Sequence, residues 1–323
     1  MTPLRIGVLG AAGIARRRML PAMEADPGIR VVAIASRRAS RAEGLASRYG
    51  ARAFGDYEML LADAEVEAVY VPLPLALHAP WVEAALRAGK HVLAEKPIAM
   101  DAATSRRLIA LAAGRGLVLM ENVLFVHHSQ HGAVRRLAAE IGELRSFQAS
   151  FAIPRLPADD IRYDPDLGGG ALWDVGVYPV RAAIHFLGPE LRVVGAARRS
   201  DHRVDLGGAA LLRRPDGVSA QLVFGLDDAY QNSYELRGST GRITVDRAFT
   251  PPAGHLPEVT LERHGTRERV TLPADDQTGR LLKTFVTAVR SGAAESADSL
   301  RQIELLDEIR NFSHHSHPEV PVG

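Results

Sequence analysis

The sequence predicts an α/β fold in which a parallel, Rossmann-type sheet is followed by an α+β domain with a largely antiparallel open sheet. Three observations carry this expectation. Short apolar runs alternate with amphipathic stretches up to Glu121, a glycine-rich turn follows the first run, and longer strand-like segments dominate after residue 123. Continuous apolar strands separated by helices are typical of a parallel sheet covered on both faces.

The composition is that of a globular protein with two domains. The chain has 323 residues, of which 46% are hydrophobic and 24% are charged. Its 39 basic and 38 acidic residues give a net charge of +1, whereas a nucleic-acid-binding protein usually has a basic excess. The absence of cysteine excludes disulfides and thiolate chemistry and favours a cytoplasmic protein. The N-terminal apolar run is too short for a membrane helix, so we expect neither a membrane nor a nucleic-acid partner.

The first domain is expected to cover residues 1–122. Its predicted strands are the short apolar runs 5–9, 31–35, 68–71, 91–94 and 118–121. Its predicted helices are the amphipathic stretches 14–25, 39–49, 81–88 and 102–115.

The second domain is expected to cover residues 123–323. Its predicted strands are 145–153, 191–199, 207–213, 218–224, 232–237 and 242–245, with a hairpin at 259–263 and 268–272. Their close spacing favours antiparallel pairing. Its predicted helices are 130–141, 170–187, 277–290 and 299–310, and the serine- and histidine-rich residues 313–317 are expected to form a tail.

The turn after the first strand reads G-x-A-x-x-A, a variant of the dinucleotide-binding fingerprint. Gly10 permits the tight turn, Ala12 and Gly13 allow a pyrophosphate to approach, and Ala15 lets the helix pack on the strand, with Ile14 in the same turn. The helix N-terminus adds partial positive charge. A simple turn without a ligand is the alternative, but the position in a βαβ unit favours a nucleotide.

The end of the second strand indicates which nucleotide binds. NAD-specific folds usually place an acid there, whereas this chain has Ser36, Arg37 and Arg38. A serine hydroxyl can bind a 2′-phosphate and an arginine can pair with it. We therefore predict NADP(H) as the cofactor. Solvated surface arginines are the alternative, and Arg41 is a weaker candidate for the same role.

Three further motifs follow in order along the chain. Residues 71–74 read V-P-L-P with His78 downstream, residues 94–97 read A-E-K-P, and residues 168–179 read G-G-G-A-L-W-D-V-G-V-Y-P. Together with the glycine-rich turn they resemble the glucose–fructose oxidoreductase / inositol dehydrogenase / MocA-like family over essentially the whole chain. Two positions depart from the family pattern. Leu75 stands where members often have asparagine, and Tyr178 stands where many have a histidine proton donor.

Within that family, residues 125–128, 160–163, 237–242 and 249–252 resemble the NDP-hexose 3-ketoreductases of deoxysugar biosynthesis. The resemblance implies NADPH-dependent reduction of the C3 keto group of a dTDP-linked 3,4-diketo-2,6-dideoxyhexose. It also implies a homodimer or homotetramer, in which the second domain's sheet buries one face against a sister subunit.

Carbonyl reduction requires a hydride, which the nicotinamide supplies. The protein must stabilise the developing alkoxide and deliver a proton to it. Lys96 follows a parallel strand at the end where such sheets bind ligands, and Pro97 restricts it to an extended conformation. Tyr178 can donate a phenolic proton or hold the substrate hydroxyl, although it can also be a packing tyrosine. Asp174, four residues earlier on one predicted helix face, positions the substrate or tunes Lys96. The sequence leaves open whether Lys96 or Tyr178 is the proton donor.

Other residues complete the predicted site. Leu73, His78, Glu95 and Arg162 are assigned to the cofactor, while a surface position for His78 and an ordinary salt bridge for Arg162 stay open. Trp173 is assigned to the substrate pocket or the core. A sugar nucleotide carries a diphosphate, so we expect Arg162 and Arg237 to contribute to a cationic outer pocket. We expect no metal site, because no carboxylate motif accompanies the histidines at 127, 128 and 131.

Two other functions share this pattern. An NADP-dependent dehydrogenase of free sugars, cyclitols or dihydrodiols has the same fold and the same lysine, and a neutral outer pocket favours it. A non-catalytic NADP(H)-binding sensor belongs to a different class, and the presence of Lys96, Asp174 and Tyr178 argues against it.

Overall fold

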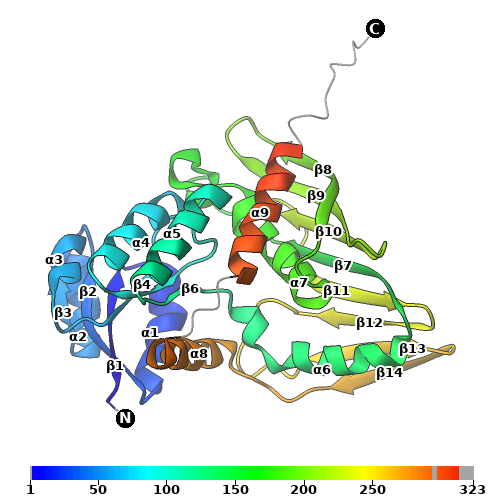
Figure 1. Cartoon of the computed structure of the whole chain (residues 1–323), viewed down its shortest axis with the longest axis horizontal. Helices are drawn as coiled ribbons and strands as arrows, with labels where there is room; N and C mark the ends of the chain where they lie inside the picture. The colour runs from blue at the N-terminus through cyan, green and yellow to red at the C-terminus, as the bar shows by residue number, and fades with distance from the viewer. Residues whose placement is uncertain (1, 293–296, 313–323) are drawn as a thin grey trace, which may run out of the picture. The chain divides into compact units, whose positions relative to one another are not determined.

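The computed structural model describes residues 2–292 and 297–312, and the chain divides into two compact units (Figure 1). The first unit groups the chain up to His127 with Asp276–Leu300. The second unit groups His128–Asp275 with the chain from Arg301 onward. The predicted tail at 313–317 lies outside the described residues.

The first unit is built on a six-stranded parallel sheet with the strand order β3-β2-β1-β4-β5-β6. Its strands are β1 (Leu4–Leu9), β2 (Ile29–Ala35), β3 (Arg52–Phe54), β4 (Ala68–Val71), β5 (His91–Ala94) and β6 (Leu119–Glu121). This confirms the predicted parallel sheet and adds β3, which the sequence analysis did not predict.

Helices cover both faces of this sheet. One face packs against α1 (Leu20–Ala25), α2 (Ala39–Tyr49) and α8 (Gln277–Ser291), and the other against α3 (Tyr57–Ala62), α4 (His78–Arg87) and α5 (Ala102–Gly114). The short turns η1 (Ala15–Met19), η2 (Leu75–Leu77) and η3 (Leu124–His127) precede or connect these elements. Aspartates cap three of the helices: Asp56 begins α3, Asp101 begins α5 and Asp276 begins α8, each accepting backbone N–H groups.

Helix α8 corrects the expected domain division. The sequence analysis placed the whole chain after residue 122 in the second domain, but α8 belongs to the first unit. Its buried residues Leu281, Leu282 and Phe285 share one core with Ile6 and Leu20 of that unit. Burying this apolar face, not position along the chain, decides where the helix packs.

The second unit is built on an eight-stranded sheet with the order β14-β13-β12-β11-β7-β10-β9-β8. Only β7 and β10 pair in parallel, so the sheet is largely antiparallel, as predicted. Its strands are β7 (Leu144–Ala152), β8 (Arg192–Ser200), β9 (Asp205–Arg213), β10 (Ser219–Gly225), β11 (Gln231–Gly238), β12 (Gly241–Asp246), β13 (Glu258–Arg263) and β14 (Thr266–Thr271).

One face of this sheet is covered by helices and the other is open. Side chains alternate between the two faces along β11. Tyr234 and Leu236 point to the buried face, and Glu235 and Arg237 point to the open face. The helices of this unit are α6 (Ser129–Leu137), α7 (Val177–Leu187) and α9 (Ala297–Phe312), with the short turns η4 (Ala138–Ile141), η5 (Ile161–Tyr163), η6 (Pro165–Leu167) and η7 (Leu172–Gly176). Helix α7 packs on β7 and β10.

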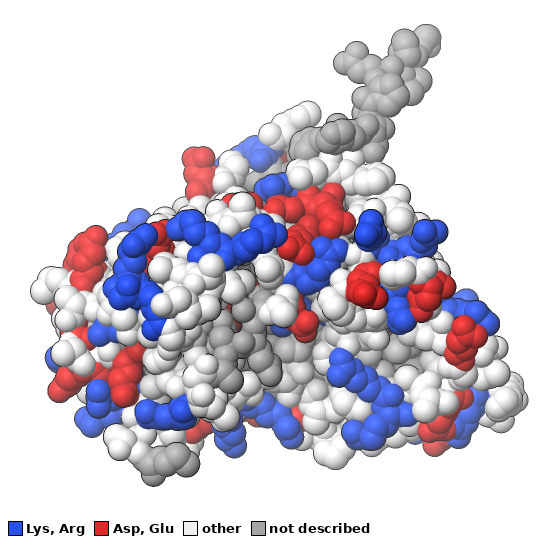
Figure 2. All heavy atoms as spheres, in the orientation of Figure 1, with Lys and Arg blue, Asp and Glu red and all other residues white. Residues whose placement is uncertain are grey.

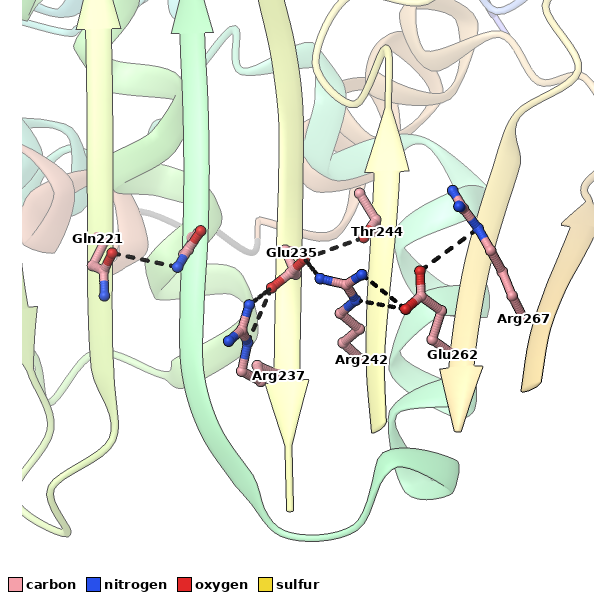
Figure 3. Close-up of polar contacts among 8 residues, drawn as sticks. Gln221, Glu235, Arg237, Arg242, Thr244, Glu262 and Arg267 are labelled. Atoms are coloured by element: carbon pink, nitrogen blue, oxygen red, sulfur yellow. Dashed lines mark hydrogen bonds and ion pairs between the residues drawn. The ribbon is translucent and has the colours of Figure 1, made fainter. Parts of the chain in front are cut away.

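The open face carries a polar ladder that crosses neighbouring strands (Figure 3). Glu235 accepts from Arg237 and pairs with Arg242, Arg242 pairs with Glu262, and Glu262 pairs with Arg267. Each of the two glutamates is flanked by arginines, and the three arginines leave the ladder with a net charge of +1.

Acidic and basic side chains also alternate over the face of the molecule in Figure 2. No helix within the described residues is long and apolar enough to cross a membrane.

Candidate active site

The glycine-rich turn is enclosed at the carboxyl end of β1. Gly10 has a φ of +119° and donates its N–H to the Ala35 carbonyl at 2.9 Å. A Cβ at this position would lie 2.9 Å from Cδ2 of Leu73, so a larger residue would be strained and crowded. Ala15 is fully buried and Ile14 packs against the same core. Leu73, predicted on the cofactor path, therefore does lie at the predicted nucleotide turn.

A hollow of about 490 Å³ opens beside this turn. Ala11, Ala12 and Gly13 line one side, and Arg16, Ser40, Arg41, Gly44 and Leu45 line the rest. Neither Arg16 nor Arg41 forms an ion pair within the described residues. Arg41 was predicted as a weaker candidate for the 2′-phosphate, and Arg16 was not among the predicted site residues. The sequence feature that could have identified Arg16 is its position directly after the fingerprint, in the helical turn η1.

The three residues predicted to select NADP lie at the end of β2. Ser36 is buried, and its Oγ accepts the Arg38 N–H at 3.3 Å. Arg37 and Arg38 are exposed. Burial raises the pKa of the neighbouring Tyr57, and the charge of Arg37 opposes this. None of the three lines the hollow, so their contact with a 2′-phosphate stays a prediction.

Lys96 is half-buried and follows β5, at the carboxyl end of the sheet, as predicted. Glu95 beside it accepts hydrogen bonds on one oxygen, Oε1, from Tyr70 Oη at 2.6 Å and from Asn122 Nδ2 at 2.5 Å. These donors come from β4 and from the residue after β6, the strands on either side of β5. The sequence analysis did not identify Tyr70 or Asn122.

His78 is buried with both ring nitrogens engaged. Nδ1 lies 2.8 Å from the Pro97 carbonyl oxygen and Nε2 lies 2.8 Å from the Leu73 carbonyl oxygen. Burial lowers the pKa of His78, and the two carbonyls partly oppose this. The ring thus joins the segments after β4 and β5 and holds Leu73 and Pro97 in place. A direct contact between His78 and the cofactor stays a prediction.

In the second unit, Arg162 and Asp174 form a close ion pair. Arg162 Nε donates to Asp174 Oδ2 at 2.6 Å, and its NH1 group donates to Asp160 at 3.1 Å. The two carboxylates raise the pKa of Arg162, chiefly through Asp174. The structure thus shows the salt bridge that the sequence analysis left open for Arg162.

Asp174 and Tyr178 lie on either side of a change in helix type. Asp174 is on the π-helical turn η7, and Tyr178 is the second residue of α7, followed by Pro179. The sequence predicted a helix over 170–187, and the structure divides this range between η7 and α7. A π turn is wider than an α turn, so the two side chains are offset differently from a regular i, i+4 pair. The half-buried Tyr178 ring packs edge-on against the Phe151 ring, with 4.6 Å between the two ring centroids.

Two glycines and a buried carboxylate hold the start of η7. A Cβ on Gly169 would lie 2.5 Å from the Arg162 carbonyl oxygen, and one on Gly170 would lie 2.5 Å from Oδ1 of Asp205. Asp205 accepts the Leu172 N–H at 2.7 Å, and burial raises the pKa of this carboxyl. The glycine run therefore serves close packing beside Arg162 and Asp174.

The two remaining predicted substrate residues occupy different surroundings. Trp173 is buried, with the Arg310 guanidinium 5.4 Å from its ring centroid, which favours the core interpretation. Arg237 belongs to the polar ladder of the open face. Its contact with a substrate stays a prediction. Within residues 2–292 and 297–312, no three or more histidine, aspartate or glutamate side chains are grouped so that they could hold a metal ion.

Two protein-family models match the chain. An oxidoreductase family with an NAD-binding Rossmann fold, GFO/IDH/MocA, matches residues 4–123, and the GFO/IDH/MocA C-terminal domain matches residues 133–244. These matches cover both units.

Individual relatives match over nearly their whole length. A dTDP-3,4-didehydro-2,6-dideoxy-alpha-D-glucose 3-reductase from Actinomadura kijaniata is 53% identical over 95% of both chains. A protein of the same name from Streptomyces violaceoruber is 53% identical over 96% of both chains. Among solved structures, a 3-ketoreductase from Actinomadura kijaniata in complex with NADP and TDP-benzene is 53% identical. It has a TM-score of 0.94 and covers 96% of this chain and 98% of its own.

Proposed function

Because the chain belongs to the GFO/IDH/MocA oxidoreductase family, we propose that it is an NADPH-dependent 3-ketoreductase of a dTDP-linked 3,4-diketo-2,6-dideoxyhexose. The observation that carries the proposal is 53% identity to a 3-reductase of that sugar over 95% of both chains. A match over 95% of this chain is long enough to include parts of both units.

The cofactor assignment to NADP(H) fits the residues of the first unit. Gly10 provides a turn that a larger side chain would obstruct, and the adjacent hollow presents Arg16, Ser40 and Arg41. Cationic guanidinium groups and backbone N–H groups at a helix start are suited to phosphates. We assign the phosphate-bearing part of the cofactor to this hollow. Ser36, Arg37 and Arg38 stay the predicted contacts of the 2′-phosphate, with Arg41 of the hollow as a further candidate.

When bound, NADPH supplies the hydride for carbonyl reduction. The side chains of this protein then have two tasks, which are to stabilise negative charge on the carbonyl oxygen and to deliver a proton. Lys96 is assigned to both, because an ammonium group favours an alkoxide and can protonate it. Tyr178 is the second candidate for the proton. Asp174 orients the substrate while Arg162 holds its carboxylate in place.

The substrate's diphosphate requires cations at the outer pocket. Arg162 is the better candidate, although it is already next to the carboxylate of Asp174. Arg237, predicted for the same role, lies on the open face of the sheet next to Glu235. A free-sugar dehydrogenase would not need a cation for a diphosphate, so Arg162 separates the alternatives.

We also propose that the open face of the second unit's sheet binds a second copy of the chain, giving a dimer or tetramer. The polar ladder on β11–β14 continues on β9 and β10 into the exposed apolar residues Leu211 and Val223, which are 41% and 43% exposed. A self-complementary surface of mixed polarity suits a two-fold interface. The cytoplasmic location rests on the sequence alone and stays a prediction.

The assay follows NADPH oxidation with freshly generated dTDP-3,4-diketo-2,6-dideoxyglucose, with free sugars and polyols tested in parallel with NADP⁺. Turnover of the dTDP-sugar, with a new hydroxyl at C3 of the product, is the expected result. Turnover of a free polyol alone would move the protein to the sugar-dehydrogenase alternative. Cofactor binding without turnover of any carbonyl or sugar would favour the sensor.

A further inference from the structure

We propose that Tyr70 and Asn122 are positioning residues that fix Glu95 so that its second carboxylate oxygen, Oε2, accepts a hydrogen bond from the nicotinamide half of NADP(H). The inference rests on the cofactor of the proposed function and deepens it. It concerns the first unit alone, and it assigns a role to two buried side chains outside the recognised motifs.

The sheet places both donors beside Glu95. Strand β5 lies between β4 and β6, and backbone hydrogen bonds continue past the strand ends, from Glu95 N–H to Val71 O at 3.2 Å and from Asn122 N–H to Ala94 O at 2.7 Å. Tyr70 therefore approaches the carboxylate from one neighbouring strand and Asn122 from the other. With its backbone and Oε1 both held, Glu95 has little rotamer freedom left.

The two donors are themselves fixed. Tyr70 is fully buried, and burial together with the charge of Glu95 raises its pKa well above the usual value, so its hydroxyl remains protonated and donates. Asn122 is also buried, with Nδ2 toward Glu95 and Oδ1 without a hydrogen-bond partner in the described part of the chain. Turning the amide over would point its oxygen at a carboxylate. The side chain thus keeps an unsatisfied acceptor to hold Glu95, an arrangement that occurs where function outweighs stability.

Because both bonds end on Oε1, Oε2 is left for another donor. Within the described residues, no hydrogen bond or ion pair reaches Oε2. Glu95 is partly exposed and lies next to Lys96, at the carboxyl end of the sheet, where open α/β sheets bind their ligands.

The charge of Glu95 decides which half of the cofactor it can serve. A carboxylate accepts hydrogen bonds, and the nicotinamide half offers ribose hydroxyls and carboxamide N–H groups as donors. The phosphate-rich adenosine half would be repelled by it, and that half is suited to Arg16 and Arg41 instead. The first unit thus separates an acceptor for the nicotinamide half from cations for the phosphates.

The test compares two ligands in purified full-length protein. NADPH has both halves, whereas 2′,5′-ADP has the adenosine and its phosphates but no nicotinamide. We expect Tyr70→Phe to raise the Kd of NADPH about tenfold and to leave that of 2′,5′-ADP within about twofold of wild type. Tyr49→Phe is the matched control. It removes another buried tyrosine hydroxyl of the same unit, one without a hydrogen-bond partner in the described chain, and should change neither Kd.

Asn122→Leu provides a second variant if the first folds poorly. It removes the donor and the unsatisfied acceptor together, so we expect an unchanged melting temperature and the same selective loss of NADPH affinity. In a Glu95→Ala background, Tyr70→Phe should cause no further change in the Kd of NADPH, because the hydroxyl acts only through that carboxylate.

Equal weakening of both ligands by Tyr70→Phe, or no weakening of NADPH, overturns the inference. If wild-type protein binds neither ligand, the cofactor assignment fails and the inference with it. That failure is distinguishable because it is already present before any substitution.

Discussion

Arg162 and Asp174 are joined by a hydrogen-bonded ion pair, with 2.6 Å between Nε of the guanidinium and Oδ2 of the carboxylate. The pair connects the turn η5 to the π-helical turn η7, and Asp160 adds a second carboxylate to the same guanidinium. The carboxylate of Asp174 is therefore held in position by the Arg162 side chain of η5 as well as by the backbone of its own helical turn.

Replacing Arg162 should impair catalysis through Asp174. We expect Arg162→Ala to lower kcat/KM by about 10- to 100-fold, because a carboxylate loses a charged hydrogen-bond partner and its orientation. Steady-state kinetics with the dTDP-sugar measures this. Arg155→Ala is the control, since Arg155 is largely exposed and, among the described residues, forms an ion pair with Asp227 alone, at 3.5 Å. Equal kcat/KM values in wild type and Arg162→Ala would show that the pair does not serve the reaction.

Lys96→Ala should lower kcat by about 10² to 10⁴-fold, the usual effect of removing a positioned proton donor. The Kd of NADPH should change little. Lys283→Ala, which removes an exposed lysine from α8, serves as control and should keep full activity. Full activity in Lys96→Ala would remove that residue from the mechanism, and a matching loss in Tyr178→Phe alone would make the tyrosine the proton donor.

The hollow beside the glycine-rich turn predicts which arginines recognise the cofactor phosphates. We expect Arg41→Ala to raise KM for NADPH by about 10-fold or more and to affect NADH less, because only NADPH carries the 2′-phosphate. Arg37→Ala tests the sequence-based choice in the same assay. Arg48→Ala lies on the same helix outside the hollow and should be neutral. An equal rise in KM for NADPH and NADH would assign Arg41 to the pyrophosphate, which both cofactors carry. No rise in either KM would show that Arg41 contacts neither the pyrophosphate nor the 2′-phosphate.

Gly169 should not tolerate a side chain. We expect Gly169→Ala to reduce the free energy of unfolding by about 1–3 kcal/mol, because its Cβ would lie 2.5 Å from a backbone carbonyl oxygen that cannot easily move. Urea denaturation measures the change. Gly195→Ala in β8 is the control, since a Cβ there has no atom within 4 Å in the described structure. Comparable stability of the two variants would show that the glycine run is not required for packing.

The buried His131 should make stability depend on pH. Burial, followed by the charges of His185 and His128, lowers the pKa of His131 well below the usual 6.5, and its Nδ1 lies 2.9 Å from Tyr234 Oη. A lowered folded-state pKa stabilises the protein above the unfolded-state value, and this contribution is lost as pH falls. We expect the free energy of unfolding to fall below about pH 6.5, by up to about 1.4 kcal/mol per pH unit for this proton.

His131→Phe provides the comparison for that pH dependence. Denaturation at about pH 7.5 and about pH 5.5 should show a smaller difference in the variant, even though it starts from lower stability. The same difference in both proteins would assign the proton to another group.

The strands with the clearest apolar runs were the ones that could be predicted from sequence. β4 and β5 have the predicted bounds because four consecutive buried residues form β4 and three follow the half-buried His91 in β5. β3 and α3 were missed, since β3 is a three-residue edge strand without a buried residue and α3 has only six residues. Such short elements form because the neighbouring sheet is already in place. The π-helical turns were also unpredictable, because the sequence pattern of a π turn resembles that of an α-helix.

The candidate site residues also divide into those with a local sequence pattern and those that only the fold brings together. Lys96 and Asp174 belong to motifs that are contiguous in sequence, so the sequence alone proposes them as site residues. Tyr70 and Asn122 act on Glu95 from 25 and 27 positions away, and only the strand order brings the three together. Trp173 belongs to a contiguous motif, but the sequence did not show whether it lies in the pocket or in the core. Its position against Arg310 depends on α9, which lies far from Trp173 along the chain.

The return of α8 to the first unit has a consequence for how the protein is made. During synthesis, the ribosome releases the whole Rossmann sheet long before it makes the helix that supplies Leu281, Leu282 and Phe285 to its core. Until then, α1 and α2 cover only part of that face of the sheet, and the apolar surface that α8 will cover is open to nonspecific association. A fragment that stops after His127 should therefore aggregate rather than bind nucleotide, and expressing the α8 segment with it in trans is the way to recover a folded half.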